Sequence, residues 1–488
     1  MAMTEFIAAV ELSSTKISGI AGKKNEDGTI QVLAFAQEDA TSFMKKGVVY
    51  NLDKTAIALT SIIENLETTL NSKVARIYVG ISGQSVHTVK NVINRTLDDI
   101  EIISQELVDS ICDENIDLPV DKMTILEVAP QEFKIGNDYQ LDPVGVASDH
   151  LEGHFMNVVA RETVKRSLIH SFEKANIEIA DLLVAPLAAA KLLVPIQDRR
   201  SGCAFVDFGA ETTTIAIYKN DLLRFLTVIP LGGNNITKDL TSLKIEENRA
   251  EYLKLQLGDI NYKDTDEDVP DTFYIDDEKK REVPIFKINN IIKARSEEII
   301  ANIWNQIQLS GYHDKLLAGI FITGGASNLK GLPEMIKDIT HIDRVKVGTP
   351  TVKIAHSKLI QEMKDKEAPN SLYTILGLLA SGDMNCAKID KPIEGTLFEG
   401  EELIEKQETV QHEKTPEEIK EEQRLIQQKK EEEEKRQQEK LKLQQEKEEE
   451  AKKRNKKKKK RSWGTSILDR FEEIQKNIFN DGDEIKND

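Results

Sequence analysis

Residues 204–218 read AFVDFGAETTTIAIY: an apolar run, a small polar turn and a second, alternating stretch. This order predicts a hairpin in which one strand delivers Asp207 to a turn and another strand returns. Such a hairpin suits phosphate, because Gly209 lets backbone N–H groups approach closely and the hydroxyls of Thr212 and Thr213 add donors. The carboxylate of Asp207 suits the waters of a Mg²⁺ ion. An ordinary tight hairpin with a polar tip is the alternative for this stretch alone.

A second copy of the pattern lies near the N-terminus, where residues 9–20 read AVELSSTKISGI. Glu11 takes the place of the acidic residue, and Ser14, Thr15 and Lys16 supply the polar turn. An internal duplication separated by about two hundred residues predicts two similar lobes that face one cleft. We therefore expect the two turns to hold phosphates, with Glu11 and Asp207 holding the metal ion.

A third segment completes the predicted site. Residues 320–332, IFITGGASNLKGL, indicate a buried strand that runs into a turn at Gly324-Gly325 and then into a helix. The backbone of such a turn can lie flat against a base or a ribose. The order and spacing of the three segments predict a nucleotide cleft more specifically than any one of them does.

Two further candidates lie between these segments. Gly232-Gly233 follows a predicted strand at the start of a helix whose free amides could bind phosphate, although a simple tight turn is the alternative. Glu251 and Lys254 are three residues apart on the next predicted helix, so they share a face suited to ribose and base. A solvated salt bridge is the alternative for that pair.

Composition narrows the class of protein. The chain has 488 residues, of which 39% are hydrophobic, and a net charge of −18, which argues against a general nucleic-acid binder. Its three cysteines are far apart, so neither a disulfide framework nor a zinc site is expected, and a reducing cytoplasm fits best. The N-terminus lacks a basic segment typical of a signal peptide, and the most apolar stretch, residues 180–195, is too short to span a membrane.

The periodicity predicts an α/β protein with two lobes. Residues 4–83 and 162–200 form the expected first lobe, 84–161 an inserted small α+β subdomain, and 201–390 the second lobe. In the second lobe, residues 258–280 are acidic and are expected to form a loop. The next predicted helix carries isoleucines at helical spacing, with Arg295 among them on an otherwise aliphatic face. A cation there is costly unless it meets a partner or water, and an internal salt bridge is the alternative.

The composition changes beyond residue 390. Residues 391–461 form a charged linker, either an isolated helix or a disordered spacer, that ends in a basic run from Lys452 to Arg461. The spacing of apolar residues over 462–482 predicts an amphipathic helix. Its apolar stripe contains Trp463, Ile467, Leu468, Phe471, Ile474, Ile478 and Phe479. Because a basic run precedes it, we expect this helix to lie on an anionic membrane surface, with a partner-binding helix as the alternative.

Eight segments in this order resemble the FtsA family of bacterial cell-division proteins, within the actin-like ATPases, over Thr4 to about Ser381. They are KKGVVYNLD, IYVGISG, LDPVGV, APLAAAKLL, VDFGAETTTIAIY, IPLGGNNITKDL, AEYLK and ITGGASNLKGL. The resemblance implies ATP and Mg²⁺ in the cleft, self-polymerisation, and attachment at the cytoplasmic face of the inner membrane at the division site. It also implies contacts with other division proteins and tethering of the tubulin-like FtsZ, whose tail docks in that family where Arg295 lies here.

This sequence departs from the family pattern at the phosphate hairpins. Glu11 and Ser13 stand where Asp and Gly are usual, and Ala210, Glu211 and Thr214 stand where Gly, Gly and Asp are usual. Bulk and charge at Glu211 would repel a polyphosphate unless the side chain turns outward. Nucleotide binding is therefore expected to survive better than hydrolysis, which we expect to be slow or absent. A pilus-assembly protein related to PilM and a sugar kinase of the same fold are the alternative functions.

Overall fold

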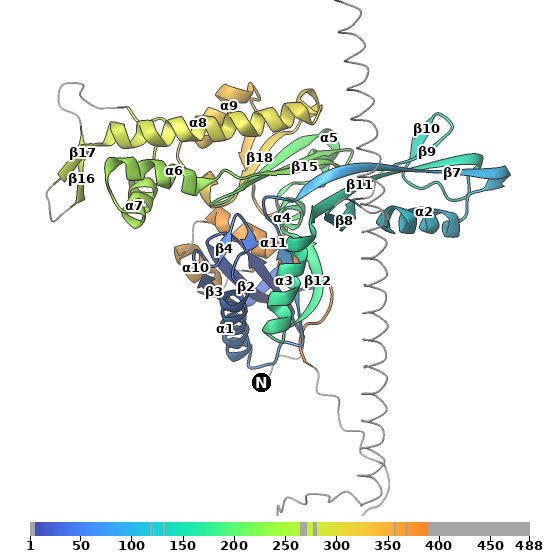
Figure 1. Cartoon of the computed structure of the whole chain (residues 1–488), viewed down its shortest axis with the longest axis horizontal. Helices are drawn as coiled ribbons and strands as arrows, with labels where there is room; N and C mark the ends of the chain where they lie inside the picture. The colour runs from blue at the N-terminus through green and yellow to red at the C-terminus, as the bar shows by residue number, and fades with distance from the viewer. Residues whose placement is uncertain are drawn as a thin grey trace, which may run out of the picture. The chain divides into compact units, whose positions relative to one another are not determined.

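The computed structural model describes residues 5–117, 120, 122–129, 132–263, 271–276, 281–355, 358–366 and 369–388 (Figure 1). The predicted linker at 391–461 and the predicted amphipathic helix at 462–482 lie outside these residues. Within the described part of the chain, no helix is both long and apolar enough to cross a membrane.

The first lobe is built on a five-stranded sheet with the order β12-β6-β1-β2-β3. Strands β1 to β3 form an antiparallel meander, whereas β6 and β12 run parallel to β1 and to each other. The strands are β1 (Ile7–Leu12), β2 (Lys16–Lys24), β3 (Ile30–Asp39), β6 (Arg76–Ile81) and β12 (Glu178–Val184), with the short pair β4 (Met44–Lys45) and β5 (Val48–Val49) outside the sheet. Strands β1 and β2 confirm the hairpin predicted at residues 9–20.

Helices cover both faces of this sheet (Figure 1). They are α1 (Leu52–Leu70), α3 (Glu162–Lys174), α4 (Ala185–Leu193) and α11 (Tyr373–Ser381). The short helix α5 (Ile196–Ser201) comes directly after α4 in the chain. Helix α1 begins where the Asn51 side chain accepts the Lys54 N–H, 3.1 Å away, and it buries Leu59, Ile62, Leu66 and Leu70 as its periodicity predicts.

The end of the described chain corrects the predicted boundary of the second lobe, 201–390. The chain returns to the first lobe from about residue 353, where the Ile30 N–H donates to the Lys353 carbonyl at 2.9 Å, and helix α11 then packs against α4, β1 and β2. Gly377 permits this packing, because a Cβ there would lie 2.7 Å from the Ala188 carbonyl oxygen. The Cys386 N–H donates to the Phe6 carbonyl, 2.8 Å away, and completes the return. Only these contacts between distant residues decide the assignment, since α11 itself is a short apolar helix that fits either lobe.

The second lobe and the inserted segment share one ten-stranded sheet. Its order is β10-β9-β11-β7-β15-β14-β13-β18-β19, with β8 paired to β11. The strands from the insert are β7 (His87–Ile102), β8 (Met123–Ala129), β9 (Phe133–Ile135), β10 (Asp138–Gln140) and β11 (Ala147–Arg161), beside helix α2 (Gln105–Asp117). Those from the second lobe are β13 (Cys203–Phe208), β14 (Thr213–Lys219), β15 (Leu222–Ile229), β18 (Gly319–Thr323) and β19 (Val345–Val347).

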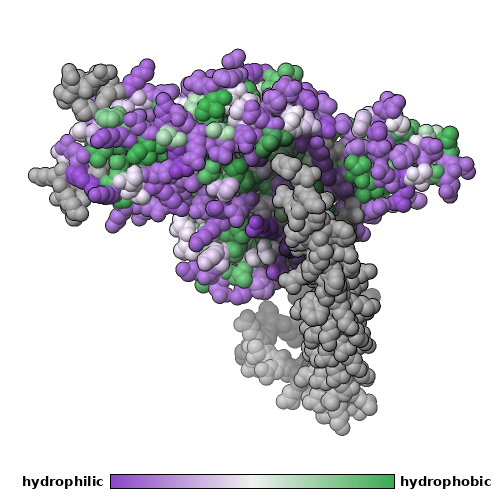
Figure 2. Space-filling model, turned by 45° about the horizontal axis from the view of Figure 1, so that its top comes forward, coloured by the Kyte–Doolittle hydropathy of each residue, from purple (hydrophilic) through white to green (hydrophobic). Residues whose placement is uncertain are grey.

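The insert therefore leaves the first lobe along the chain but joins the second lobe through its sheet. Thr227 of β15 pairs with His87 of β7, and the Thr88 hydroxyl accepts the Leu226 N–H at 2.9 Å. The insert also has its own core around Ile111 and Leu151, and hydrophobic residues show on its surface at the right of Figure 2. The sequence predicted a separate α+β subdomain here but not the strand with which it pairs, since the pairing of β7 with β15 is a tertiary contact.

The second lobe places its helices over its sheet. They are α6 (Gly233–Leu240), α7 (Glu247–Leu257), α8 (Ile285–Leu309) and α9 (Leu332–Thr340). Helix α10 (Lys358–Lys366) packs instead against β3 of the first lobe (Figure 1). Helix α8 buries Ile288, Ile292, Ile299 and Ile303, which confirms its predicted apolar face. The expected loop at 258–280 is wrong in part, because β16 (Thr272–Asp276) pairs with β17 (Arg281–Pro284). The acidic composition concealed the short alternating stretch that forms this hairpin.

Candidate functional site

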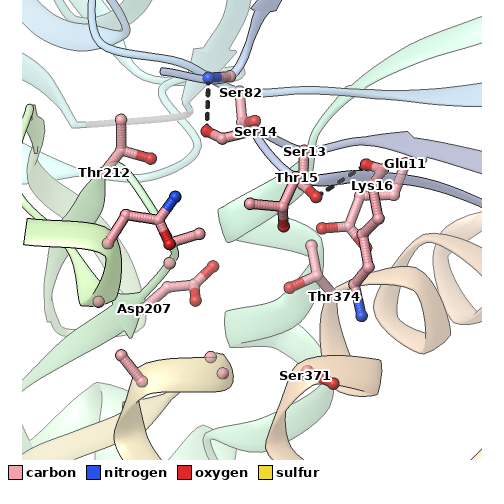
Figure 3. A pocket seen from close by; sticks show the side chains of 18 of the residues that line it. Glu11, Ser13, Ser14, Thr15, Lys16, Ser82, Asp207, Thr212, Ser371 and Thr374 are labelled. Carbon is pink, nitrogen blue, oxygen red and sulfur yellow. Dashed lines mark hydrogen bonds between the residues drawn. The ribbon is translucent and has the colours of Figure 1, made fainter. Parts of the chain in front are cut away.

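A single cleft of about 690 Å³ collects most of the predicted site residues. Both hairpin turns, the Gly-Gly turn after β18 and helix α7 line it (Figure 3). The predicted residues that line the cleft are Glu11, Ser14, Thr15, Lys16, Asp207, Gly209, Thr212, Gly233, Glu251, Lys254, Gly324 and Gly325. Thr213 and Gly232 do not line it.

The two hairpins share one register. The last paired residues are Leu12 with Ile17 in the first hairpin and Phe208 with Thr213 in the second, so each turn encloses residues 13–16 or 209–212. Each turn is closed by an equivalent bond. The Ser13 N–H donates to the Lys16 carbonyl at 3.0 Å, and the Gly209 N–H donates to the Thr212 carbonyl at 2.9 Å. Glu11 and Asp207 therefore occupy equivalent positions one residue before the last pair, on opposite sides of the cleft.

The first hairpin is held from both ends of its turn. The Ser13 hydroxyl donates to the Lys16 carbonyl, 2.9 Å away, and the Ser14 hydroxyl oxygen accepts the Gly47 N–H, 2.9 Å away. Figure 3 shows Thr15 and Lys16 on one side of the open space, with Asp207 and Thr212 on the other. Because a hydroxyl can accept and donate at once, the Ser14 proton stays available to a ligand in the cleft.

Asp207 lines the cleft next to the Gly324-Gly325 turn. Burial raises the pKa of its carboxyl to about 6. Gly324 has φ +89°, and a Cβ there would lie 2.4 Å from Asp207 Oδ1, so only glycine permits the approach of the Gly-Gly turn.

The acidic residues of the cleft fit Mg²⁺. Among the described residues, no group of three His, Cys, Asp or Glu side chains is placed to hold a metal ion by itself. Magnesium is usually held by one or two carboxylates together with waters and substrate phosphates, so Asp207 and Glu11 on opposite sides of the cleft suit it.

The structure corrects the roles predicted for Gly232 and Thr213. The Thr213 side chain is buried, and its hydroxyl donates to the Leu231 carbonyl at 2.8 Å. Gly232 lies against the back of the second hairpin, where a Cβ would be 2.6 Å from the Gly209 carbonyl oxygen. Both residues shape the hairpin and do not face the cleft. Their direction depends on how two segments pack, which local residue types do not reveal.

The start of α6 also differs from the expectation of free amides. The Gly233 N–H donates to the Gly209 carbonyl at 3.0 Å, and the Asn234 N–H donates to the Ala210 carbonyl at 2.7 Å. The orphan amides of the helix are thus satisfied by the nearest exposed carbonyls, those of the second hairpin turn. The helix start supports the phosphate hairpin from behind, although Gly233 still borders the cleft.

Glu251 and Lys254 form the salt bridge that was the alternative for this pair, and the salt bridge is part of a larger network. Lys254 Nζ donates to Glu251 Oε2 at 2.7 Å, to the Thr237 hydroxyl at 2.8 Å and to the Gly233 carbonyl at 3.1 Å. Only 12% of the Lys254 side chain is exposed. The network fixes the cleft face of α7 next to Leu255, whose exposed side chain offers an apolar contact to a ligand.

The cleft also contains residues that were not predicted to bind a ligand, although Ser13, Ala210 and Thr214 were noted as departures from the family pattern. They are Ser13, Gln37, Glu38, Asp39, Gly47, Ser82, Ala185, Pro186, Ala210, Thr214, Asn234, Leu255, Ala326, Ser371 and Thr374. Several of them neighbour predicted residues on the same turns. Gln37 to Asp39 at the end of β3, and Ser371 and Thr374 at the start of α11, belong to no sequence motif, and only the fold brings them to the cleft.

Glu211 turns outward from the cleft. Its carboxylate accepts the Lys46 N–H of the first lobe at 2.6 Å, and it is not among the lining residues. The charge repulsion expected at this departure from the family pattern is thereby reduced.

Arg295 lies on α8, outside the cleft. Its guanidinium contacts both carboxylate oxygens of Asp239, with Nη2 to Oδ1 at 3.0 Å, and it also pairs with Glu298. The hydrogen bond with Asp239 raises the pKa of Arg295 further. A cation on this helix face is therefore stabilised within the chain by internal ion pairs.

The sequence of this chain is similar to those of known cell-division proteins. The family model "Cell division protein FtsA" matches residues 204–370. Cell division protein FtsA of Porphyromonas gingivalis is 32% identical over 342 residues, covering 69% of this chain and 71% of the relative. Cell division protein FtsA of Bacillus subtilis is 26% identical over 352 residues, covering 71% and 79%.

A solved structure, the PilM-PilN type IV pilus biogenesis complex, is similar with a TM-score of 0.54 and 15% identity, covering 76% of this chain and 97% of that one. At that identity the likeness supports the fold alone, the two-lobed actin-like architecture. The sequence relatives decide the family: this chain belongs to the FtsA family of bacterial cell-division proteins.

Proposed function

We propose that the cleft binds ATP with Mg²⁺ between the two lobes. The observation that supports this is the convergence of two hairpin turns of equal register, one from each lobe, with the Gly324-Gly325 turn on one cleft. A cleft of about 690 Å³ lies within the usual range for small-molecule sites. The hairpin turns offer hydroxyls and backbone to the phosphates, and the Glu251 and Lys254 network offers polar groups to the ribose and base.

Calorimetry on the full chain tests this proposal. Wild-type protein should bind ATP with Mg²⁺ more tightly than ATP with EDTA, because the metal links phosphates to Asp207. In Asp207→Asn the Mg²⁺ dependence should be lost, whereas the affinity measured in EDTA should remain. That affinity is the internal control for folding. Absence of nucleotide binding by the wild type, or an undiminished Mg²⁺ dependence in the variant, would refute the proposed site.

Hydrolysis by this site is proposed to be slow or absent. The proposal rests on the departures from the family pattern at the two phosphate hairpins, of which Glu11, Ser13, Ala210 and Thr214 line the cleft. Release of phosphate should stay near background with ATP alone and with small sugars added. Sugar-dependent turnover would instead favour the kinase function.

In the cell, we propose, the protein tethers FtsZ to the cytoplasmic membrane at the division site, and Arg295 receives the acidic FtsZ tail. An incoming carboxylate can share the guanidinium with Asp239 and Glu298, since a quarter of the Arg295 side chain is exposed. Arg295→Glu should abolish binding of the tail peptide, and Arg295→Lys should weaken it by losing bidentate geometry. Lys293→Glu, an exposed charge reversal on the same helix, is the matched control and should bind normally.

Membrane attachment is proposed to depend on residues 462–482. Large apolar side chains contribute more to such binding than single basic residues, each worth about 1 kcal/mol near an anionic surface. Phe471→Glu should release the protein from liposomes at any salt concentration. Neutralising Lys456 to Lys460 should weaken binding mainly on anionic lipid at low salt. The opposite ranking of the two variants would contradict the amphipathic mode.

Self-assembly and contacts with other division proteins are proposed for the inserted subdomain. Ile100 and Ile102 near the end of β7 and Leu141 after β10 are each more than 60% exposed, an unusual exposure for isoleucine and leucine. Ile102→Asp should reduce the sedimenting fraction of the protein on lipid, whereas Ile57→Asp, an equally exposed isoleucine on α1, should not.

A further inference from the structure

Glu211 connects the two lobes at the tip of the second hairpin. Its Oε2 atom lies 2.6 Å from the Lys46 backbone nitrogen, which belongs to the tight turn between β4 and β5. Lys46 has φ +50° and Gly47 has φ +72°, so both residues of this turn are left-handed. A bond between an amide and a carboxylate is stronger than one between neutral groups.

The same turn holds the first phosphate hairpin. The Gly47 N–H donates to the Ser14 hydroxyl oxygen at 2.9 Å, next to the amide that Glu211 binds. Ser14 and Gly47 both line the cleft. The residue equivalent to Glu211 in the first hairpin is Thr15, whose shorter side chain lines the cleft. The connection between the lobes is therefore a property of the glutamate at position 211.

The turn also contacts the start of the inserted subdomain. The Gln84 N–H donates to the Lys46 carbonyl at 3.2 Å, three residues before β7 begins. A Cβ on Gly47 would lie 2.8 Å from Gly83 Cα, so the two backbones touch. One two-residue turn thus contacts the second hairpin, the first hairpin and the root of the insert.

We propose that Glu211 is a positioning residue for the nucleotide site. Its carboxylate binds the Lys46 amide and so fixes the Lys46–Gly47 turn. The Gly47 amide of that turn binds the Ser14 hydroxyl and orients it toward the phosphates. This role rests on the proposed nucleotide binding, and it makes Glu211 a contributor to affinity although it does not touch the ligand.

Hydrogen exchange without nucleotide tests the bond itself. In the full chain, Glu211→Ala should speed exchange of the Lys46 amide by about tenfold or more, the range expected for one hydrogen bond to a charged group. Glu211→Gln keeps an acceptor and should give an intermediate rate. Exchange at Gly47 and Gln84 should rise along with Lys46. Glu26→Ala, which removes the same charge from an exposed loop, is the control and should change none of these rates.

Nucleotide affinity tests the positioning role. Glu211→Ala should bind ATP with Mg²⁺ about tenfold more weakly than wild type, with Glu211→Gln partly restored and Glu26→Ala unchanged. Unchanged exchange at Lys46 in Glu211→Ala would overturn the proposal, and so would a tighter affinity, which would identify Glu211 as an electrostatic barrier. If the Lys46 amide exchanges faster in Glu211→Ala but the wild type binds no nucleotide, the Glu211–Lys46 bond is supported and the proposed nucleotide binding is refuted.

Discussion

Two neighbouring glycines at the start of α6 should respond very differently to a single methyl group. At Gly232, an alanine Cβ would lie 2.6 Å from the Gly209 carbonyl oxygen and 2.7 Å from that of Ala210. Backbone atoms cannot swing aside as a side chain can, so the hairpin turn or the helix start must move. At Gly233 the nearest atom is the Cβ of Ala326 at 3.2 Å, a contact that small shifts relieve.

The cost of Gly232→Ala follows from these contacts. Overpacking costs about 1–3 kcal/mol. Movement of the turn also strains the bonds from the Gly233 and Asn234 amides, each worth about 0.5–1.5 kcal/mol. We expect Gly232→Ala to lower the free energy of unfolding by about 2–4 kcal/mol and to weaken ATP binding, because the displaced turn carries Gly209. We expect Gly233→Ala to cost less than about 1 kcal/mol.

Urea unfolding and calorimetric titration of both variants measure these effects. A Gly232→Ala protein as stable as wild type would refute the assignment of Gly232 to hairpin packing. Unchanged stability with lost nucleotide binding would restore its original interpretation as a ligand-contacting residue. Gly28→Ala controls for general effects of replacing a glycine, since a Cβ there meets no atom within 4 Å, although its φ of +78° brings some local strain.

Three further predictions concern charge and packing. Burial raises the pKa of Asp207 from 3.8 to about 6, so the folded protein holds this proton more tightly than the unfolded chain does. The stability that the protonated side chain contributes is therefore complete below about pH 4 and is lost as the pH rises through 6. Asp207→Asn should therefore exceed wild type in free energy of unfolding by about 1–3 kcal/mol at pH 8, with the difference vanishing toward pH 4, as urea titrations at several pH values would reveal. Cys112 is half-buried whereas the other two cysteines are buried, so a thiol reagent should label Cys112 first, although burial raises the pKa of its thiol; mass mapping that finds either buried thiol labelled first would contradict the fold. Arg224, bound to both oxygens of Glu132, ties β15 to the insert, so Arg224→Glu should speed hydrogen exchange at the β7 and β15 junction, and adding Glu132→Arg should restore it; failure of the reversal would show that the ion pair is not responsible.

The local pattern of the chain was sufficient to predict most of its site and many of its elements, although not the β16–β17 hairpin. Two strand-turn-strand segments and one strand followed by Gly324-Gly325 indicated a cleft, and the residues at those turns do line one. This worked because a phosphate hairpin is a local object: its strand alternation, its turn and its acid lie within fifteen residues. The apolar face of α8 was predictable for the same reason.

Tertiary structure alone decided where side chains point and which distant segments meet. Gly232 packs against the second hairpin, the Thr213 hydroxyl donates to the Leu231 carbonyl, Glu211 reaches the Lys46 amide, and α11 packs on the first lobe. The pairing of β7 with β15, which joins the insert to the second lobe, is a contact of the same kind. Each of these outcomes depends on contacts between residues far apart in the chain, where packing and hydrogen-bond satisfaction select one arrangement among several that the local residue types allow equally.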